Sequence, residues 1–458
     1  MFFFPFIWYL SLLLFFFSIF FFSDTINTFG IYFSQREWFE YFWILPFYFL
    51  SEIIFICLNI SGIQNDKNIL NNLSIENKLE TLQKTAVIIP CHFGYNELKK
   101  TIDSLTNIFQ YIFIADNGCS KNQEFEEFCF LKGIFYHHYV EPNKTNAIFL
   151  TTKYIKNKYP FIQYIVLLDD DTIVNDNFFI RTDLLQEPTT AGYTCTIGIQ
   201  NAHEKSILEK WIDFEYRTIS FRNRSRNFHS LKFLHGIICI YKINHLLSIF
   251  QWNPCHIGGL PFGEDAFAGL TARQIGYQLK HDHLNIVYTH CPNQLFSFSF
   301  SRIQGYGSSS LFKQRVLRWY LSWPRRLFTE FGLLFIYDTG SWFGNILYRL
   351  DFIWYLWILS NACWWFFTLS LTTFKSIENI YWFFYFHFAF FILNGFTSYI
   401  RTYFMNPIES KNIPWYIPLT FPCFMFLLLF LYSTSFLISL FYYIPFKRIN
   451  YKECYKNI

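Results

Sequence analysis

Residues 164–174 read YIVLLDDDTIV, an apolar run that ends in three consecutive aspartates. A short apolar run bounded by polar residues is typical of a buried strand. Because strand side chains alternate between two faces, Asp169 and Asp171 share one side and Asp170 points to the other. That pair can converge on one Mg²⁺ or Mn²⁺ ion, which would offset the repulsion between the carboxylates. A turn of solvated aspartates or a helix N-cap is the alternative interpretation.

The neighbouring segments predict an α/β domain. Residues 85–92, 110–118 and 133–140 read TAVIIPCH, QYIFIADNG and GIFYHHYV, and each is strand-like with a polar end. Between the first two, residues 96–109 carry apolar side chains at helical spacing. Strands that alternate with helices form a mainly parallel sheet, which binds its ligands at the carboxyl ends of the strands.

The composition predicts membrane spans. Of 458 residues, 52% are hydrophobic and 15% are charged, against about 25% charged in soluble domains. Residues 2–22 carry no charge over about a bilayer's thickness, and 38–60 are interrupted only by Glu40 and Glu52. Residues 2–22 lack the basic start and cleavage site of a signal peptide, which favours an uncleaved anchor.

The C-terminal part is again apolar. Residues 352–374 and 381–399 are predicted spans, and 414–446 form either one tilted helix or a tight hairpin. Residues 328–348 favour an interfacial helix. The predicted organisation is two N-terminal spans in 1–60, a linker or amphipathic segment in 61–84, the α/β domain in 85–327, and an interfacial helix with two to four spans in 328–458.

Basic residues predict the orientation. The loop 23–37 has only Arg36, whereas the flank after the second span and the segment 322–328 are basic, which places the domain in the cytoplasm. We expect a multi-pass protein of the plasma membrane or an endomembrane. The basic C-terminal tail favours an even number of C-terminal spans, and so the hairpin. The 11 cysteines contain no C-x-x-C pair and read as reduced thiols, and a net charge of +4 is too weak to indicate a nucleic-acid partner.

Three further positions carry possible chemistry. Asp116 ends the second predicted strand, where it can accept a hydrogen bond from a uracil imide or form an Asx turn with Asn117 and Gly118. Lys144 lies between a strand and a helix, where it can reach a diphosphate or be a solvated turn residue. In GGLPFGEDAFAGL (258–270), Asp265 is either a general base or a helix N-cap.

In this order, the motifs resemble those of family 2 glycosyltransferases with a GT-A fold. The resemblance covers about residues 85–325 and is closest to the membrane-embedded cellulose, chitin and hyaluronan synthases. It implies a Rossmann-like domain flanked by transmembrane helices, with Mg²⁺ or Mn²⁺ held by Asp169 and Asp171. It further implies that Asp116, Lys144 and these two aspartates bind the nucleotide sugar, and that Asp265 is the catalytic base.

The segment FKQRVLRWYLSW (312–323) resembles the Q-x-x-R-W motif of processive synthases. The resemblance implies that Gln314 and Arg318 hold the diphosphate and that the Trp319 ring packs against the acceptor sugar. Gln314 is displaced by one residue from the motif, although i and i+4 still share a helix face. The alternative is a basic interfacial helix whose arginines face lipid headgroups: Arg315, Arg318, Arg325 and Arg326.

The acceptor side has a looser resemblance. FLHGIICIY (233–241) is similar to the small-residue segment that lines the acceptor site, which implies acceptor contacts from Gly236 and from Glu264. His235 stands where the family has a small residue, and it is either part of that site or a satisfied core histidine.

The predicted function is inverting transfer of a sugar from a nucleotide sugar, expected to be a UDP-sugar, to a growing polysaccharide. Asp265 would deprotonate the acceptor hydroxyl. One alternative is a single transfer to a lipid such as ceramide or a polyprenyl phosphate. Another, from a different class, is an inactive membrane scaffold that retains the fold. The expected partners are the nucleotide sugar, a polysaccharide or lipid acceptor, and membrane lipids.

Overall fold

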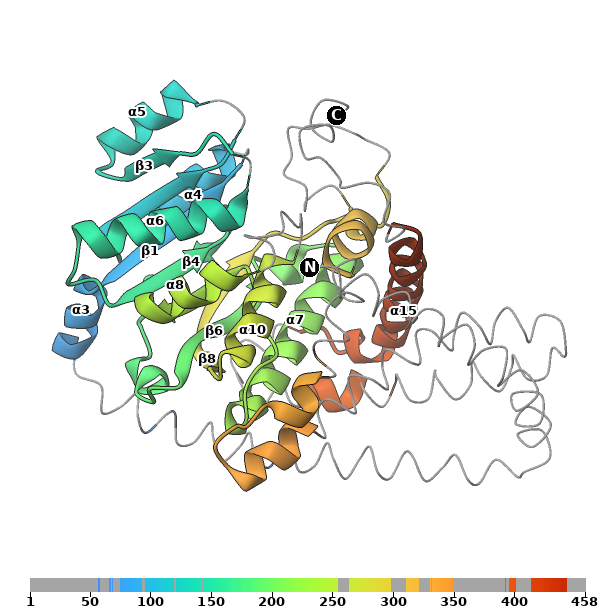
Figure 1. Cartoon of the computed structure of the whole chain (residues 1–458). Helices are drawn as coiled ribbons and strands as arrows, with labels where there is room; N and C mark the ends of the chain where they lie inside the picture. The colour runs from blue at the N-terminus through green and yellow to red at the C-terminus, as the bar shows by residue number, and fades with distance from the viewer. Residues whose placement is uncertain are drawn as a thin grey trace, which may run out of the picture.

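A computed structural model describes the α/β domain and parts of the C-terminal region (Figure 1). The described residues are 75–92, 95–118, 121–141, 143–253, 263–297, 310–320, 332–349, 395–400 and 413–442, with the single residues 57, 66, 68, 330 and 392. The predicted spans 2–22 and 352–374 lie outside these residues, as do nearly all of 38–60 and most of 381–399.

The first four strands form a parallel sheet, as predicted. They are β1 (Thr85–Cys91), β2 (Tyr111–Asp116), β3 (Phe135–His138) and β4 (Tyr164–Leu168). Their spatial order β3-β2-β1-β4 is that of one half of a Rossmann sheet. All four carboxyl ends therefore lie at one edge, where β4 leads directly into Asp169.

The second half of the sheet is mixed. β7 (Ile238–Lys242) runs antiparallel to both β4 and β6 (Thr190–Ile199), and β6 runs parallel to β8 (Gln278–Thr289). The short β5 (Ile173–Val174) pairs antiparallel with β8. Because β6 and β8 have the same direction as β4, their carboxyl ends lie at the same edge as the aspartates.

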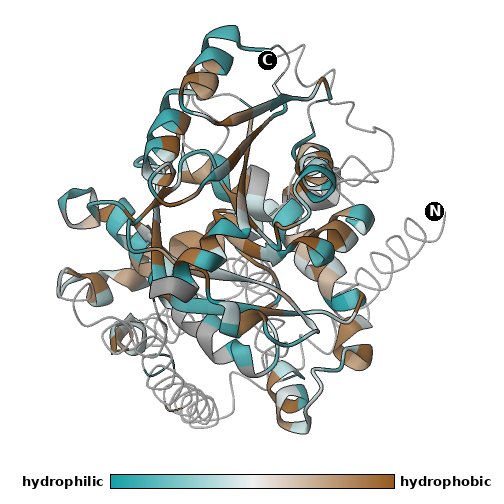
Figure 2. Ribbon diagram, turned by 90° about the vertical axis from the view of Figure 1, so that its left-hand side faces the viewer, coloured by the Kyte–Doolittle hydropathy of each residue, from teal (hydrophilic) through white to brown (hydrophobic). Residues whose placement is uncertain are grey.

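Helices cover both faces of this sheet, and each face has its own apolar core. Alternate residues of β1 divide between them: Val87 and Ile89 belong to one core, and Ala86 and Ile88 to the other. In Figure 2 the hydrophobic colour follows the central strands, whereas the surrounding helices mix hydrophobic and hydrophilic residues. The first face carries α4 (Tyr95–Leu105), α5 (Gln123–Leu131) and α7 (Ile207–Ser225), and the second α6 (Lys144–Lys158), α8 (Ile243–Trp252) and α10 (Glu264–Gln274).

Short helices complete the described domain. The second part of the predicted linker is helical, since α3 spans Ile75–Gln83. The remaining short elements are 3₁₀ turns: η2 (Thr182–Leu185), η3 (Ala202–Glu204) and η4 (Arg226–Phe228).

The apolar C-terminal segment is one helix, α15 (Ile417–Tyr442), so the hairpin interpretation is wrong. Residues 423–442 contain no Gly, Pro, Asn or Asp that would favour a tight turn. Among the described helices, this one alone is long and apolar enough to cross a membrane, over Ile417–Ser435, and half of that stretch is buried. Its buried stripe joins the core beside α7 (Figure 1): Ile417, Phe421, Phe424, Leu428 and Leu431.

The segment predicted as one interfacial helix has two helical stretches, 332–336 and 342–349. Gly340 interrupts them at φ +79°, a conformation that glycine adopts readily. Leu333, Tyr337 and Tyr348 pack on Phe267 and Leu270 of α10, so this segment is attached to the domain.

Candidate active site

Lys144 joins two of the predicted motifs at the carboxyl edge of the sheet. Its Nζ lies 2.8 Å from Asp169 Oδ1 and 2.8 Å from Glu264 Oε1. The three side chains are 27%, 25% and 18% exposed. The structure therefore brings the end of β4 and the first residues of α6 and α10 into one half-buried, charged corner.

Both helices begin at this corner for local reasons. Asn143 caps α6, because its side chain accepts a hydrogen bond from the Asn146 backbone N–H at 3.1 Å. Gly263 precedes α10 with φ +84°, which turns the chain sharply before Glu264. The N-terminal end of each helix carries partial positive charge, which favours acidic groups and anions at this place.

Asp265 lies next to this corner, in the first turn of α10. Its Oδ1 accepts a hydrogen bond from the Ala266 backbone N–H at 2.7 Å. A Cβ atom on Gly236 would lie 3.6 Å from Asp265 Oδ2, so this glycine faces the carboxylate. Burial raises the pKa of the nearby Cys239 thiol, and Asp265 and Asp169 raise it further. Cys239 is therefore a neutral thiol beside the carboxylates.

The three consecutive aspartates have different neighbours. Asp169 pairs with Lys144, whereas Asp171 Oδ1 accepts a hydrogen bond from Thr289 Oγ1 at 3.2 Å. The backbone carbonyl of Asp170 accepts one from Thr101 Oγ1 at 2.9 Å. The strand ends at Leu168, so strict strand alternation does not extend through the aspartates.

The predicted metal ligands are the two aspartates Asp169 and Asp171. Within the described ranges, no group of three or more His, Cys, Asp or Glu residues is placed to hold a metal ion. Asp169 and Asp171 still fit Mg²⁺ or Mn²⁺, which bind few protein carboxylates and complete their coordination with water and substrate phosphate. Asp169 pairs with one cation of the protein itself, the Lys144 ammonium, at 2.8 Å.

Asp116 is fully buried and its carboxylate is occupied by protein donors. Oδ1 accepts from the Gly118 backbone N–H at 2.8 Å, which is the Asx turn of the alternative interpretation. Oδ2 accepts from the Tyr95 hydroxyl at 3.2 Å and from the Tyr136 hydroxyl. A uracil imide would have to replace a tyrosine hydroxyl to reach this carboxylate.

The segment around Trp319 forms a π-helix, η5 (Lys313–Trp319). A π-helix has i→i+5 hydrogen bonds and so holds about one more residue per turn than an α-helix. Gln314 is buried and lies five residues before Trp319, which is the spacing of one π-helical hydrogen bond. The side chain of Arg318 and residues 321–329 lie outside the described set.

Arg315 is buried inside the protein, so the alternative interpretation, in which it faces lipid headgroups, is wrong for this residue. Its Nη2 donates to Glu215 Oε2 at 2.6 Å, and its guanidinium lies 4.2 Å from the centre of the Trp319 ring. Burial raises the pKa of Glu215 and Arg315 opposes this rise. Sequence reasoning missed this pair because 100 residues separate its members.

His235 lies beside Gly236 and has polar neighbours. Its Nε2 is 3.1 Å from Asn223 Nδ2, and its carbonyl accepts from Cys239 Sγ at 2.8 Å. The pKa of His235 is lowered to about 4, mainly by burial and in smaller part by the nearby charges of Arg226 and Arg315. These contacts agree with the satisfied-histidine interpretation.

Comparisons with known proteins place these observations in context. No protein-family model matches the sequence, and no curated protein matches it. Glucosyl-3-phosphoglycerate synthase from Mycobacterium tuberculosis, solved with Mn²⁺, UDP and phosphoglyceric acid, is 12% identical at a TM-score of 0.32, over 47% of this chain and 75% of that one. GalNAc-T7, solved with UDP, GalNAc and Mn²⁺, is 13% identical at 0.35, over 59% and 56%. Likenesses this loose carry no argument about activity, so the function has to be inferred from the residues of this chain.

Proposed function

We propose that this chain is an inverting glycosyltransferase that uses a nucleotide sugar, and that the donor is a UDP-sugar. The observation that carries the proposal is the Lys144 bridge between Asp169 and Glu264, with Asp265 in the next position. This corner combines a cation, two helix N-termini and a carboxylate that can accept a proton. A general base and groups that stabilise the leaving diphosphate can each accelerate transfer from a sugar diphosphate.

Each charged group has a role in this proposal. Asp265 takes the proton of the acceptor hydroxyl as that oxygen attacks the anomeric carbon. Lys144 and the N-terminal end of α6 stabilise the negative charge that develops on the leaving diphosphate. Asp169 and Asp171 would hold Mg²⁺ or Mn²⁺, which supplies further charge stabilisation to the diphosphate when bound.

The binding roles of the remaining residues extend this proposal. Gln314 and Arg318 are proposed to contact the diphosphate, and Gly236 and Glu264 to line the acceptor side. Trp319 is partly buried against Tyr216, with 6.4 Å between the ring centres, which supports a fixed aromatic surface for a sugar. Asp116 is proposed to orient the base through Tyr95 and Tyr136, or directly after one hydroxyl moves away.

The proposed acceptor is a growing polysaccharide at a cytoplasmic membrane face, in a multi-pass protein. The Arg318–Trp319 pair and the apolar C-terminal segments support this choice. Transfer to a lipid acceptor is the alternative. Gel separation of the products after incubation with labelled UDP-sugars distinguishes the two acceptors. Only transfer to a growing polysaccharide gives products much longer than one sugar.

The test is the Asp265→Asn variant in purified full-length protein, assayed for UDP release from a panel of UDP-sugars with Mn²⁺. Loss of a general base lowers turnover by about 10²–10⁴-fold. UDP binding and thermal stability should not change, because Asn keeps the size and the acceptor oxygen. The matched control is Asp103→Asn, at an exposed ion pair with Lys132.

Two outcomes would contradict parts of the proposal. Turnover near the wild-type rate in Asp265→Asn would show that another group is the base. Absence of UDP release by the wild-type protein with every sugar would favour the inactive scaffold.

A further inference from the structure

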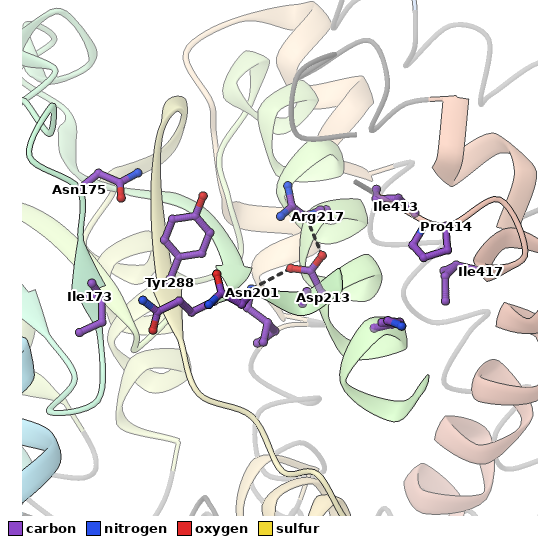
Figure 3. A pocket seen from close by; sticks show the side chains of 13 residues that line it. Ile173, Asn175, Asn201, Asp213, Arg217, Tyr288, Ile413, Pro414 and Ile417 are labelled. Atoms are coloured by element: carbon purple, nitrogen blue, oxygen red, sulfur yellow. Dashed lines mark hydrogen bonds and ion pairs between the residues drawn. The ribbon is translucent and has the colours of Figure 1, made fainter. Parts of the chain in front are cut away.

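A second cavity lies at the same edge of the sheet, beyond the carboxylate corner (Figure 3). Its volume is about 300 Å³, which is at the lower end of the range for small-molecule sites. It lies where β6 and β8 end, between the sheet, α7 and the start of α15. None of the described side chains assigned above to nucleotide or acceptor binding lines it.

The cavity is close to the aspartates in the chain. Ile173 lines it and is two residues beyond Asp171, so the two Cα atoms are at most roughly 7 Å apart. Tyr288 also lines it and precedes Thr289, which donates to Asp171. A ligand here would be a neighbour of the proposed active site but would use different side chains.

One part of the cavity has an excess of positive charge. Among its described lining residues, Lys210 and Arg217 are basic and Asp213 alone is acidic. Both oxygens of Asp213 are engaged, Oδ1 by the Ile199 backbone N–H at 2.7 Å and Oδ2 by Arg217 Nε at 2.8 Å. The side-chain amide of Asn201 adds further donors. The cavity therefore favours a ligand that carries negative charge and acceptor oxygens.

The opposite side of the cavity is apolar. Figure 3 shows Ile413, Pro414 and Ile417 across from Asn175 and Tyr288, with Arg217 and Asp213 between the two sides. These three residues precede or begin α15, the apolar helix that is long enough to cross a membrane. Lys210 Nζ lies 3.3 Å from the Tyr416 hydroxyl, so its ammonium is held where the polar and apolar sides meet. Cationic side chains next to an apolar side fit an amphiphile with an acidic head.

We propose that this cavity binds the phosphate head of a lipid, with the apolar chain directed along the first turn of α15. The head would contact Lys210 and Arg217, and the first carbons of the chain would contact Ile413, Pro414 and Ile417. This site is separate from the transferase activity proposed above. Its test therefore measures binding and needs no turnover.

The experiment measures binding of farnesyl phosphate to the purified full-length protein by calorimetry, beside inorganic phosphate and farnesol. Farnesyl phosphate should bind at least tenfold more tightly than either, because only it fills both sides of the cavity. Lys210→Gln should weaken it about tenfold or more, as expected for loss of one charged contact. Lys205→Gln, an exposed change outside the cavity, should not alter it.

A second variant keeps the test decisive if Lys210→Gln alters folding. Ala202→Phe places a ring in the cavity and should abolish binding without removing a charge. Equal affinity for inorganic phosphate would show a site for free phosphate, and equal affinity for farnesol would show only apolar contact. Either result overturns the proposal. Binding that is lost in Lys144→Gln but retained in Lys210→Gln would also overturn it, because it would place the ligand at the carboxylate corner.

Discussion

Two clusters of oppositely charged side chains differ in their exposure to solvent. Lys144 bridges Asp169 and Glu264 at the sheet edge, where all three side chains are partly exposed. Arg273, in the last turn of α10, pairs with Glu330 at 2.5 Å, and both side chains are at most 1% exposed. The first cluster is accessible to a ligand and the second is not.

The hydrogen bonds of the two clusters explain their difference in accessibility to a ligand. Arg273 also donates to the Tyr348 hydroxyl at 2.9 Å and to the Lys232 carbonyl at 2.9 Å, so protein groups surround its guanidinium. Lys144 holds two carboxylates that a charged ligand could replace. We therefore expect the first cluster to serve ligand binding and the second to attach the segment after residue 330 to α10.

The largest expected effect is on stability, in Arg273→Ala. This change leaves Glu330 buried without its partner, and breaking a buried ion pair in this way typically costs 3–5 kcal/mol. Urea unfolding of the purified protein, followed by tryptophan fluorescence, measures the free energy of unfolding. The double variant Arg273→Met/Glu330→Leu should recover much of the loss. A loss below about 1 kcal/mol in the single variant would show that the pair does not hold this segment in place.

Lys144→Gln should show the opposite pattern. A partly exposed ion pair contributes about 0–1 kcal/mol, so the free energy of unfolding should change little. Turnover with a UDP-sugar should fall by about 10²–10³-fold, as when one preorganised donor to a developing negative charge is removed. Lys132→Gln, at the exposed pair with Asp103, is the matched control. Destabilisation as large as that of Arg273→Ala, with unchanged turnover, would erase the distinction between the two clusters.

Local patterns were sufficient to predict the parallel half of the sheet. The four strand-like segments and the helix after β1 formed as expected, because apolar periodicity and polar ends specify them locally. The meeting of Asp169, Lys144 and Glu264 also follows from topology, since strand ends and helix starts share one edge of the sheet.

The contacts that the sequence could not predict join residues far apart in the chain. Glu215 and Arg315, and also Tyr136 and Asp116, approach only after the domain has folded. The π-helix of η5 was not predicted either, because π-helices are rare and the spacing of this segment also fits an α-helix. For α15, composition predicts an apolar environment but does not distinguish lipid from the side of a protein domain.

His235 also bears on this comparison, because it is partly buried and adjoins the proposed site through Gly236. Its pKa in the fold is about 4, below the usual 6.5, so folding favours the neutral ring. The resulting stability is complete above pH 6.5 and is lost as the pH falls towards 4, because the unfolded chain then binds the proton first.

At 1.36 kcal/mol for each pKa unit, the wild type should lose up to about 3 kcal/mol through His235 between pH 7 and pH 4. His235→Gln should flatten this part of the stability curve, whereas the control His290→Gln, at an exposed side chain, should leave it unchanged. Urea unfolding at half-unit pH steps measures both curves. Parallel curves for the wild type and His235→Gln would show that His235 titrates normally. His235 would then resemble the accessible Lys144 cluster rather than the buried Arg273–Glu330 pair.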